Sequence, residues 1–279
     1  MPTIGISSWS VRRLLGPMYQ GLAPDPQPRP RDDRFGQGDL NLLALPDTMR
    51  EQGFANLDLC HFHLPQTDNT YLDLLRERLD RAGVRLLTFL VDDGDIAAAD
   101  AGVRAEAVSA TMAWINVAAR LGAQYVRVAA GLATAKAADP AIGYSAASLV
   151  TLDTHARARG LRVITETWRS LALPPENLHA ILTATAGTVG HCADFNNYAS
   201  YGDLRKYEAL RAVLPGAATV HAGAQFDAVG ALDEADFRRC MDLAHTANFS
   251  GPYVLIFSGP GDEWAGLAQL AGLVRAAAA

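Results

Sequence analysis

The sequence has few cysteines, no long apolar run and no strongly basic segment. The three cysteines, Cys60, Cys192 and Cys240, are odd in number and form no CxxC pair, which disfavours a disulfide-based fold. Nowhere do about 18 apolar residues follow one another, as a membrane-spanning helix requires. The first residues also lack the basic and then apolar pattern of a secretion signal. We therefore expect a soluble, cytoplasmic protein with reduced thiols and no membrane partner.

The charge pattern argues against nucleic acid as a partner. The chain carries a formal net charge of −6 and has an isoelectric point near 5.6. Lysines and arginines cluster only in RPRDDR at 29–34, where two aspartates interrupt the cluster. The 279 residues are 49% hydrophobic and 19% charged, which is typical of a globular protein with a large core. This length suits one α/β barrel.

Strand-like and helix-like segments alternate along the whole chain. Eight short apolar runs are expected to form strands: 3–7, 56–60, 85–91, 125–129, 162–165, 189–193, 218–222 and 253–257. The helix-like segments between them span 39–52, about 69–83, 103–121, 145–159, 174–185, 204–214, 233–248 and 262 to the C-terminus. Several of these segments start after Asp, Asn or Ser and stop at Gly, which are the usual helix boundaries.

This alternation predicts an α/β fold, namely a single-domain (β/α)8 TIM barrel over residues 1–279. A doubly wound sheet is the alternative, but it usually has fewer strands, and no GxGxxG motif follows the first apolar run. One segment, 16–38, interrupts the rhythm and holds five of the 14 prolines. It is expected to form a long first βα loop, either as a surface excursion, as a lid over the barrel mouth or as an arm between subunits of a homo-oligomer.

Three polar residues each follow an apolar run. Glu166 follows RVIT, Asp194 follows VGHCA and His221 follows AATV. About one strand-plus-helix unit separates each of them from the next, so all three should lie at the same end of successive parallel strands. Two carboxylates and an imidazole that converge there predict a divalent-metal site. A polar layer at the barrel mouth, held by hydrogen bonds alone, is the alternative.

Other polar residues are expected at the same rim, because the catalytic groups of a barrel lie at the C-terminal ends of its strands. His61 and His63 flank Phe62 and would share one face if the strand continued through them. Arg127 lies inside an apolar run and needs a partner, for which Glu166 is the candidate, either in a structural pair or in an anion clamp. Further expected rim residues are Ser8, Trp9, Asp92, Asp93, Asp95, Trp168, Asn196, Asn197, Gln225 and Ser258.

These motifs resemble those of the xylose isomerase-like TIM barrels, also called the AP endonuclease family 2 superfamily, which include sugar phosphate isomerase/epimerase-like proteins. The phrases that carry the resemblance are LDLCHFHLP, LGAQYVRVAAG, VITET, CADFNN and VHAGAQF, in the order of the family's strands two, four, five, six and seven. The resemblance implies a metal-binding Glu at Glu166, an Asp-x-x-Asn motif at Asp194 and Asn197, and a metal-binding histidine at His221. It covers nearly the whole chain and is specific for the superfamily rather than for a substrate.

The chain departs from the family in two places. A Lys often follows the seventh-strand histidine by two positions, where this chain has Gly223. The family's fourth metal ligand is a Glu that closes the eighth strand, whereas residues 255–258 here read LIFS. In the family's isomerases and epimerases, the fifth- and eighth-strand glutamates are the two acid/base groups. Because only Glu166 remains, two-base epimerisation is disfavoured and one-base chemistry is favoured.

The resemblance implies a metal-dependent isomerase, epimerase or dehydratase of carbohydrate metabolism that acts next to the carbonyl of a sugar, keto-sugar or cyclitol. Glu166, Asp194 and His221 would bind the metal, with Mn²⁺ or Mg²⁺ favoured and Zn²⁺ or Co²⁺ open. Proton transfer is expected from Glu166 together with His61, His63 or a metal-bound water. The expected substrate-binding residues are Trp9, Arg127, Trp168, Asn197 and Gln225. The alternative is a barrel with a vestigial site that binds a sugar without catalysis or serves as a partner subunit.

Overall fold

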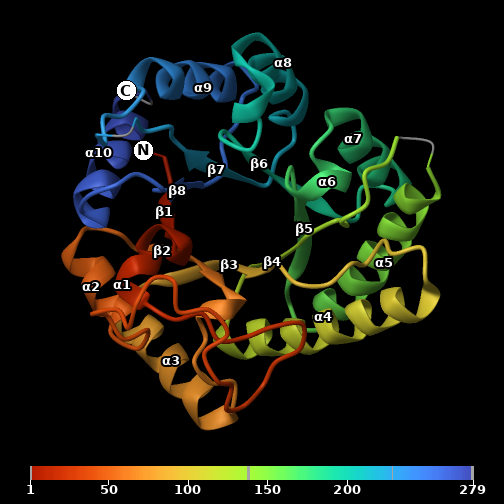
Figure 1. The fold of residues 1–279 in the computed structure, drawn as a ribbon, viewed down its shortest axis with the longest axis horizontal. Helices are drawn as coiled ribbons and strands as arrows, with labels where there is room; N and C mark the ends of the chain where they lie inside the picture. Colours follow the sequence, from red (N-terminus) through yellow and green to blue (C-terminus); the bar gives the residue numbers. More distant parts are fainter. Residues whose placement is uncertain (1, 137–138, 228, 278–279) are drawn as a thin grey trace.

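Eight parallel strands close into a barrel in this computed structural model, which describes residues 2–136, 139–227 and 229–277 (Figure 1). The strands are β1 (Ile4–Ser7), β2 (Asn56–Cys60), β3 (Arg85–Val91), β4 (Tyr125–Val128), β5 (Arg162–Glu166), β6 (Gly190–Asp194), β7 (Thr219–Gly223) and β8 (Tyr253–Ile256). β1 pairs with both β2 and β8, which closes the sheet. The prediction of a TIM barrel is confirmed, and every expected strand overlaps an observed one.

Helices follow the strands and surround the barrel (Figure 1). The longer ones are α2 (Leu45–Glu51), α3 (Asn69–Ala82), α4 (Ala101–Leu121), α5 (Pro140–Arg157), α7 (Pro175–Ala184), α8 (Asp203–Val213), α9 (Glu234–Thr246) and α10 (Glu263–Ala277). Short turns of helix lie in the βα connections: α1 (Arg12–Leu15), α6 (Arg169–Ala172), η1 (Ser8–Val11), η2 (His61–His63) and η3 (Ala199–Tyr201). Asp68 and Asp100 cap α3 and α4 with their side chains, and Gly83 and Gly122 end these helices in the left-handed conformation.

The helix expected over 39–52 begins later than the sequence indicated. The structure starts α2 at Leu45, with Pro46 in its first turn, where proline fits the helix best. Asp39 is not the N-cap of α2, which is Ala44, and the backbone N–H of Asp39 donates to the carbonyl of Leu14. The residues before α2 therefore form a turn that ties the end of the first βα loop to α1.

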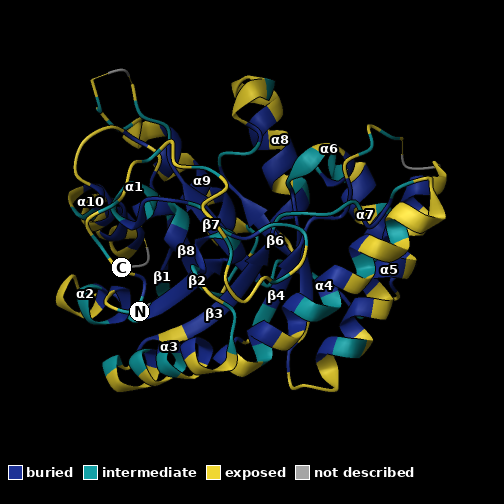
Figure 2. Ribbon diagram, turned by 60° about the horizontal axis from the view of Figure 1, so that its bottom comes forward, coloured by how far each residue is buried: buried dark blue, intermediate teal, exposed yellow. Residues whose placement is uncertain are grey.

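The strands of the barrel and parts of the surrounding helices consist of buried residues, which are dark blue in Figure 2. All residues of β2 and β7 are buried, and in β1, β3, β4, β5 and β6 only the first residue is more exposed. Polar groups at the C-terminal ends of these strands therefore lie in a largely dry environment, where they need partners. None of the described helices combines the length and the hydropathy that crossing a bilayer would take.

The long first βα loop, here called the mouth loop (residues 16–38), is anchored by polar contacts. Backbone hydrogen bonds join Met18 to Asp32 across the loop. The buried side chain of Gln20 donates to the backbone carbonyl of Leu64, just beyond η2, at 3.1 Å. The mouth loop is thereby fastened to the connection that follows β2.

Gly16 and Gly38 form the neck of the mouth loop. Both have positive φ, +77° and +70°, which favours glycine. A Cβ on Gly38 would lie 2.4 Å from the carbonyl oxygen of Leu14, and one on Gly16 would lie 2.4 Å from the backbone of Gln37. The two ends of the loop approach each other so closely that a side chain at either position would collide with backbone.

Candidate functional site

A cavity of about 610 Å³ opens at the C-terminal ends of the strands. Every strand contributes to its wall, through Ser7, Cys60, Leu90, Arg127, Glu166, Asp194, His221 and Ile256. The mouth loop contributes Met18, Gln20, Arg31, Asp32 and Arg34. Both the position and the volume are typical of small-molecule sites in barrels of this kind. The mouth loop therefore forms part of the cavity wall at the barrel mouth.

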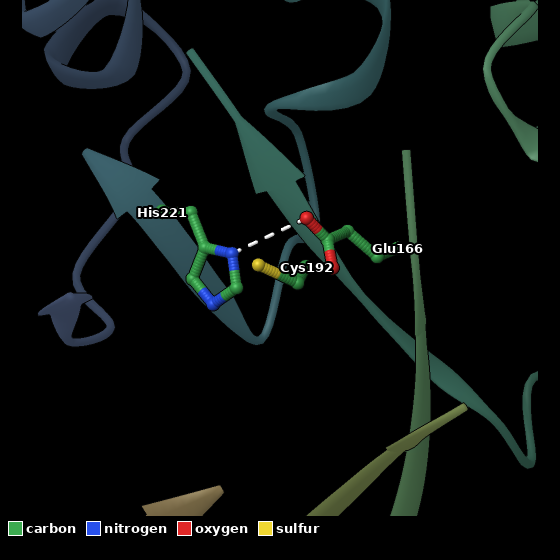
Figure 3. A group of neighbouring side chains, drawn as sticks. All are labelled: Glu166, Cys192 and His221. Carbon is green, nitrogen blue, oxygen red and sulfur yellow. Dashed lines mark hydrogen bonds and ion pairs between the residues drawn. The ribbon is translucent and has the colours of Figure 1, made fainter. Parts of the chain in front are cut away.

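Glu166, Asp194 and His221 meet inside this cavity. His221 Nδ1 lies 3.2 Å from Glu166 Oε1 and 3.6 Å from Asp194 Oδ2. The register explains the contacts, because Asp194 is paired with His221 between β6 and β7, and Glu166 with Cys192 between β5 and β6. Figure 3 shows Glu166 and His221 reaching towards each other, with the Cys192 side chain between their strands. The two carboxylates that the sequence pattern selected thus both contact His221, whereas the ligand atoms that lie within 4.8 Å of one another are those of Glu166, Cys192 and His221.

Asp58 lies behind the imidazole of His221 and was missed by the sequence analysis. Its side chain is fully buried in β2, and Oδ2 lies 3.1 Å from His221 Nε2. Its Oδ1 has no hydrogen-bond partner among the described residues. The available signal was an aspartate in the middle of the apolar run NLDLC, because a buried carboxylate needs a partner.

The donor set fits a divalent cation. Glu166, Cys192 and His221 each offer one ligand atom, and these atoms lie within 4.8 Å of one another. Burial raises the pKa of the Cys192 thiol, which therefore stays protonated and ligates poorly at neutral pH. Asp194 Oδ2 is the oxygen donor beside His221, while its Oδ1 accepts from the backbone N–H groups at 196–197. Two carboxylates and an imidazole suit Mn²⁺, Mg²⁺ or Zn²⁺.

Arg127 of β4 holds the other oxygen of Glu166. Its Nε lies 2.9 Å from Glu166 Oε2, and its Nη1 pairs with Asp92, which follows β3. Burial alone would raise the pKa of Glu166, but Arg127 and His221 lower this pKa to about 2. The carboxylate is ionised at neutral pH, with Oε1 turned towards His221. The prediction that Arg127 pairs with Glu166 is confirmed.

The carboxylates around His221 favour a positive charge on its imidazole. Burial alone would lower the pKa of the imidazole, but Cys192, Glu166, Asp194 and Asp58 together raise this pKa well above its ordinary value. Asp58 accepts a hydrogen bond from Nε2, so Nδ1 is the ring nitrogen that faces the carboxylates of Glu166 and Asp194. A proton or a metal ion at Nδ1 satisfies both facing oxygens.

The expected substrate-binding residues differ in where they lie. Trp9, Trp168 and Asn197 line the cavity, as Arg127 does. Asn197 donates from Nδ2 to Glu166 Oε1 at 3.2 Å and so also positions that carboxylate. Gln225 lies outside the described cavity wall.

His61 and His63 lie behind the cavity wall rather than in it. The residues after β2 form the 3₁₀ turn η2, so the two histidines do not continue the alternation of the strand. His63 Nδ1 is 2.8 Å from Ser8 Oγ, and the His61 ring packs against Trp114 with their centroids 5.1 Å apart. Burial lowers the pKa of His63 to about 3. Phe62, between them, is the residue of this turn that lines the cavity.

The end of β8 presents an aliphatic and a hydroxyl side chain to the cavity. Ile256 and Ser258 both line it. Ile256 is paired in register with Gly223, two residues beyond His221 on β7. The eighth strand therefore offers a hydrocarbon surface at the place where the resemblance led us to look for a second acid/base group.

Comparisons with known proteins agree with this architecture. A family model described as xylose isomerase-like TIM barrel matches residues 46–271. The structure is similar to L-ribulose 3-epimerase, with a TM-score of 0.72, 18% identity, and coverage of 100% of this chain and 96% of that chain. It is also similar to a xylose isomerase-like TIM barrel protein from Mycobacterium smegmatis in complex with magnesium, with a TM-score of 0.68, 17% identity, and coverage of 100% and 98%.

A third similar structure is 3-keto-D-glucoside 4-epimerase from E. coli, with a TM-score of 0.65, 14% identity, and coverage of 99% of this chain and 100% of that chain. At such identities these likenesses show the fold alone. A comparison with curated proteins gave no match.

Proposed function

This chain belongs to the xylose isomerase-like TIM barrel family, and we propose that it is a metal-dependent enzyme that isomerises, epimerises or dehydrates a sugar, keto-sugar or cyclitol next to its carbonyl. The observation that carries this proposal is the convergence of Glu166, Asp194 and His221 in one cavity, with Asp58 behind the imidazole. Similar solved structures include epimerases of L-ribulose and of a 3-keto-D-glucoside, which supports carbohydrate as the substrate class.

Glu166 Oε1, Asp194 Oδ2 and His221 Nδ1 would hold the metal. Mn²⁺ or Mg²⁺ suits two carboxylates best, and the imidazole leaves Zn²⁺ or Co²⁺ open. When bound, a divalent ion polarises a carbonyl oxygen and makes the neighbouring C–H group more acidic. Asp58 accepts the Nε2 proton of His221 and so fixes the ring with Nδ1 turned to the ligand position.

Glu166 is the group that removes the proton. Its low pKa keeps it ionised, so it is ready to act as a base, and Arg127 and Asn197 fix the orientation of its two oxygens. A carboxylate of such low basicity removes a proton only from a carbon that is already acidified. This requirement agrees with a reaction at the carbon next to a carbonyl.

The remaining cavity wall suits a polyol. Trp9 and Trp168 add aromatic surface to the cavity wall that the C–H groups of a sugar can contact. The mouth loop adds the polar side chains of Gln20 and Arg31, which can hydrogen-bond to hydroxyl groups.

The side of the cavity formed by β8 favours one-base chemistry. Ile256 cannot exchange a proton, and His61 and His63 do not line the cavity. Glu166 would therefore return the proton on the same face, as in aldose–ketose isomerisation through an enediol, or would start a dehydration. Epimerisation at C3 needs a proton donor on the opposite face as well.

Solvent exchange tests the proposal. A panel of keto-sugars, inososes and 3-keto-glycosides is incubated with the protein and Mn²⁺ in D₂O, and deuterium at the carbon next to the carbonyl is measured by NMR. We expect incorporation with the wild type and a loss of at least about a hundredfold in Glu166→Gln. Glu263→Gln is the matched control, because Glu263 is also buried and pairs with Arg13 outside the cavity. An active Glu166→Gln would exclude the assigned base.

A second function, sugar binding without catalysis, is favoured by one specific observation. Arg127 already neutralises Glu166, and β8 supplies no second carboxylate beside it. Metal analysis of protein grown with added Mn²⁺, Zn²⁺ or Co²⁺ separates the two functions. A wild type without metal and without exchange on any substrate of the panel would favour the binding protein, whereas a metal content that falls in Asp194→Ala would support the enzyme.

A further inference from the structure

Four arginines line the cavity, and they differ in their charge partners. The paired ones are Arg31 with Asp93, Arg34 with Asp32, and Arg127 with Asp92 and Glu166. Arg169 is the fourth, and no carboxylate pairs with it among residues 2–136, 139–227 and 229–277. Its positive charge is the one in the cavity wall that the described part of the chain leaves uncompensated.

The guanidinium of Arg169 is held in place with donors to spare. Its central carbon lies 4.2 Å from the ring centroid of Trp168, and Nη2 donates to the backbone carbonyl of Asp92 at 3.2 Å. Its Nε is buried and has no partner among the described residues. A guanidinium has five N–H donors, so most of its hydrogen-bonding capacity is open for a ligand.

The backbone at Arg169 is strained in a way that serves this placement. Its φ is +61°, in the left-handed region that residues other than glycine adopt at an energetic cost. Arg169 is the first residue of α6, directly after Trp168 and three positions after the proposed base Glu166. The turn folds the arginine back over the tryptophan ring and so keeps its guanidinium at the cavity wall.

Arg169 also lies at a defined place relative to the reacting group. A series of contacts runs from Glu166 to Arg127, from Arg127 to Asp92, and from Asp92 to Arg169. The guanidinium of Arg169 is thus linked to the carboxylate that would take the proton through two residues, the side chain of Arg127 and then Asp92, whose backbone carbonyl accepts from Arg169. A substrate whose reacting carbon lies at Glu166 would extend its far end towards Arg169.

We propose that Arg169 binds a carboxylate at the far end of the substrate, so that this enzyme acts on a keto-sugar acid rather than on a neutral sugar. This inference rests on the proposed function and names its substrate class. A single planar guanidinium matches a carboxylate through two parallel hydrogen bonds. A phosphate dianion is disfavoured, because the carboxylates of Asp32, Asp92 and Asp93 also line the cavity and would repel it more strongly.

Binding of three ligands with the same carbon chain tests the inference without turnover. They are D-fructose, D-fructuronate, in which the C6 hydroxymethyl group is a carboxylate, and D-fructose 6-phosphate. Dissociation constants are measured by calorimetry on EDTA-treated protein, because a carboxylate could otherwise bind the metal itself. We expect the wild type to bind D-fructuronate at least about tenfold more tightly than D-fructose, as for a charge-assisted pair of hydrogen bonds.

Two variants of Arg169 and a matched control test whether this residue causes the preference for D-fructuronate over D-fructose. Arg169→Gln should bind D-fructuronate and D-fructose about equally, and Arg169→Lys should keep a reduced preference, because an ammonium lacks the planar fork. Arg104→Gln is the control, since Arg104 stacks on Tyr144 at the same 4.2 Å but lies outside the cavity wall. Arg104→Gln should keep the full preference for D-fructuronate over D-fructose.

Several outcomes would overturn the inference. They are a wild type that binds the two sugars equally or binds none of the three ligands, and a preference for the acid that survives Arg169→Gln. Tighter, Arg169-dependent binding of D-fructose 6-phosphate would replace the carboxylate with a phosphate. The proposed function fails separately: solvent exchange on neutral sugars without any acid preference leaves the enzyme intact and removes this inference. Arg169-dependent binding of the acid without solvent exchange on D-fructuronate or on any substrate of the panel leaves the binding site and removes the catalysis.

Discussion

At the scale of single residues, the site depends on a carboxylate that does not line the cavity. Asp58 accepts from Nε2 of His221 and thereby decides which ring nitrogen faces Glu166 and Asp194. A carboxylate behind a ligating imidazole fixes the ring and increases its basicity. In the proposed enzyme Asp58 is therefore a positioning residue, and its effect should appear in metal binding before it appears in folding.

Asp58→Asn should weaken metal binding by about 10- to 100-fold, because an amide orients the imidazole less firmly and adds no negative charge. Titration with Mn²⁺, followed by calorimetry, measures the change. Asp153→Asn is the control, since Asp153 is equally buried but accepts from the backbone N–H of Val163 on the outside of the barrel. Equal Mn²⁺ affinities in the two variants would show that Asp58 has no part in the metal site.

His63 should make the fold sensitive to mild acid. Burial lowers its pKa to about 3 in the folded protein, whereas the unfolded chain takes up this proton near pH 6.5. Protons therefore bind preferentially to the unfolded state between these values, and the stability that His63 contributes is lost as the pH falls from about 6.5 towards 3.

Thermal unfolding of His63→Gln should accordingly show a shallower fall in Tm between pH 7 and pH 5 than the wild type shows. Glutamine keeps a polar group beside Ser8 Oγ, the partner of His63. His245→Gln, at an exposed position of α9, should follow the wild-type curve. Parallel curves for all three proteins would mean that His63 does not titrate as its burial implies.

At the scale of elements, the sequence predicted the strands and helices whose bounds depend on the local apolar pattern and on capping residues. The strand over 85–91 is a continuous apolar run, and the helix expected from about residue 69 to Gly83 is α3, so the sequence located both elements. The sequence predicted neither the late start of α2 nor the turn η2. In both places tertiary contacts override the local pattern: Leu14 binds the backbone at Asp39, and the residues after β2 turn out of the sheet.

The neck of the mouth loop should be the least tolerant part of that element. Gly36→Ala and Gly38→Ala both place a side chain at similar positive φ, +74° and +70°, so each should cost about 1 kcal/mol from backbone strain. A Cβ at Gly38 also meets the carbonyl oxygen of Leu14 at 2.4 Å, whereas Gly36 faces open space. Urea denaturation should therefore show a clearly larger loss of stability for Gly38→Ala. Equal losses would mean that the two ends of the loop can separate freely.

At the scale of the whole molecule, the barrel joins residues that no local pattern connects. Asp58 and His221 belong to β2 and β7, which are not neighbours in the sheet, and they meet across its interior. Contacts between adjacent strands, such as the one between Arg127 and Glu166, follow from the strand order and could be predicted from the sequence. The cross-barrel contact, like the direction of His61 and His63, depends on the closed sheet and its register.

Closure of the barrel also places Ile256 of β8 on the wall of the cavity that holds Glu166. Because Ile256 is only partly buried, a carboxylate at this position would keep some contact with solvent. Ile256→Glu should therefore supply a fourth ligand and a second acid/base group at once. We expect Mn²⁺ affinity to rise by at least about tenfold, since the new charge adds to the donor set.

The same variant should also convert same-face proton return into epimerisation, which NMR would detect as a second diastereomer beside the deuterated substrate. Ser258→Glu is the matched control, because Ser258 lines the same cavity but lies two residues beyond Ile256, is exposed, and follows the end of the strand. It should change neither Mn²⁺ affinity nor stereochemistry. If Ile256→Glu binds Mn²⁺ no more tightly than Ser258→Glu, the metal does not lie between Glu166 and β8. The one-base mechanism would then need another explanation than the hydrocarbon side chain that ends this strand.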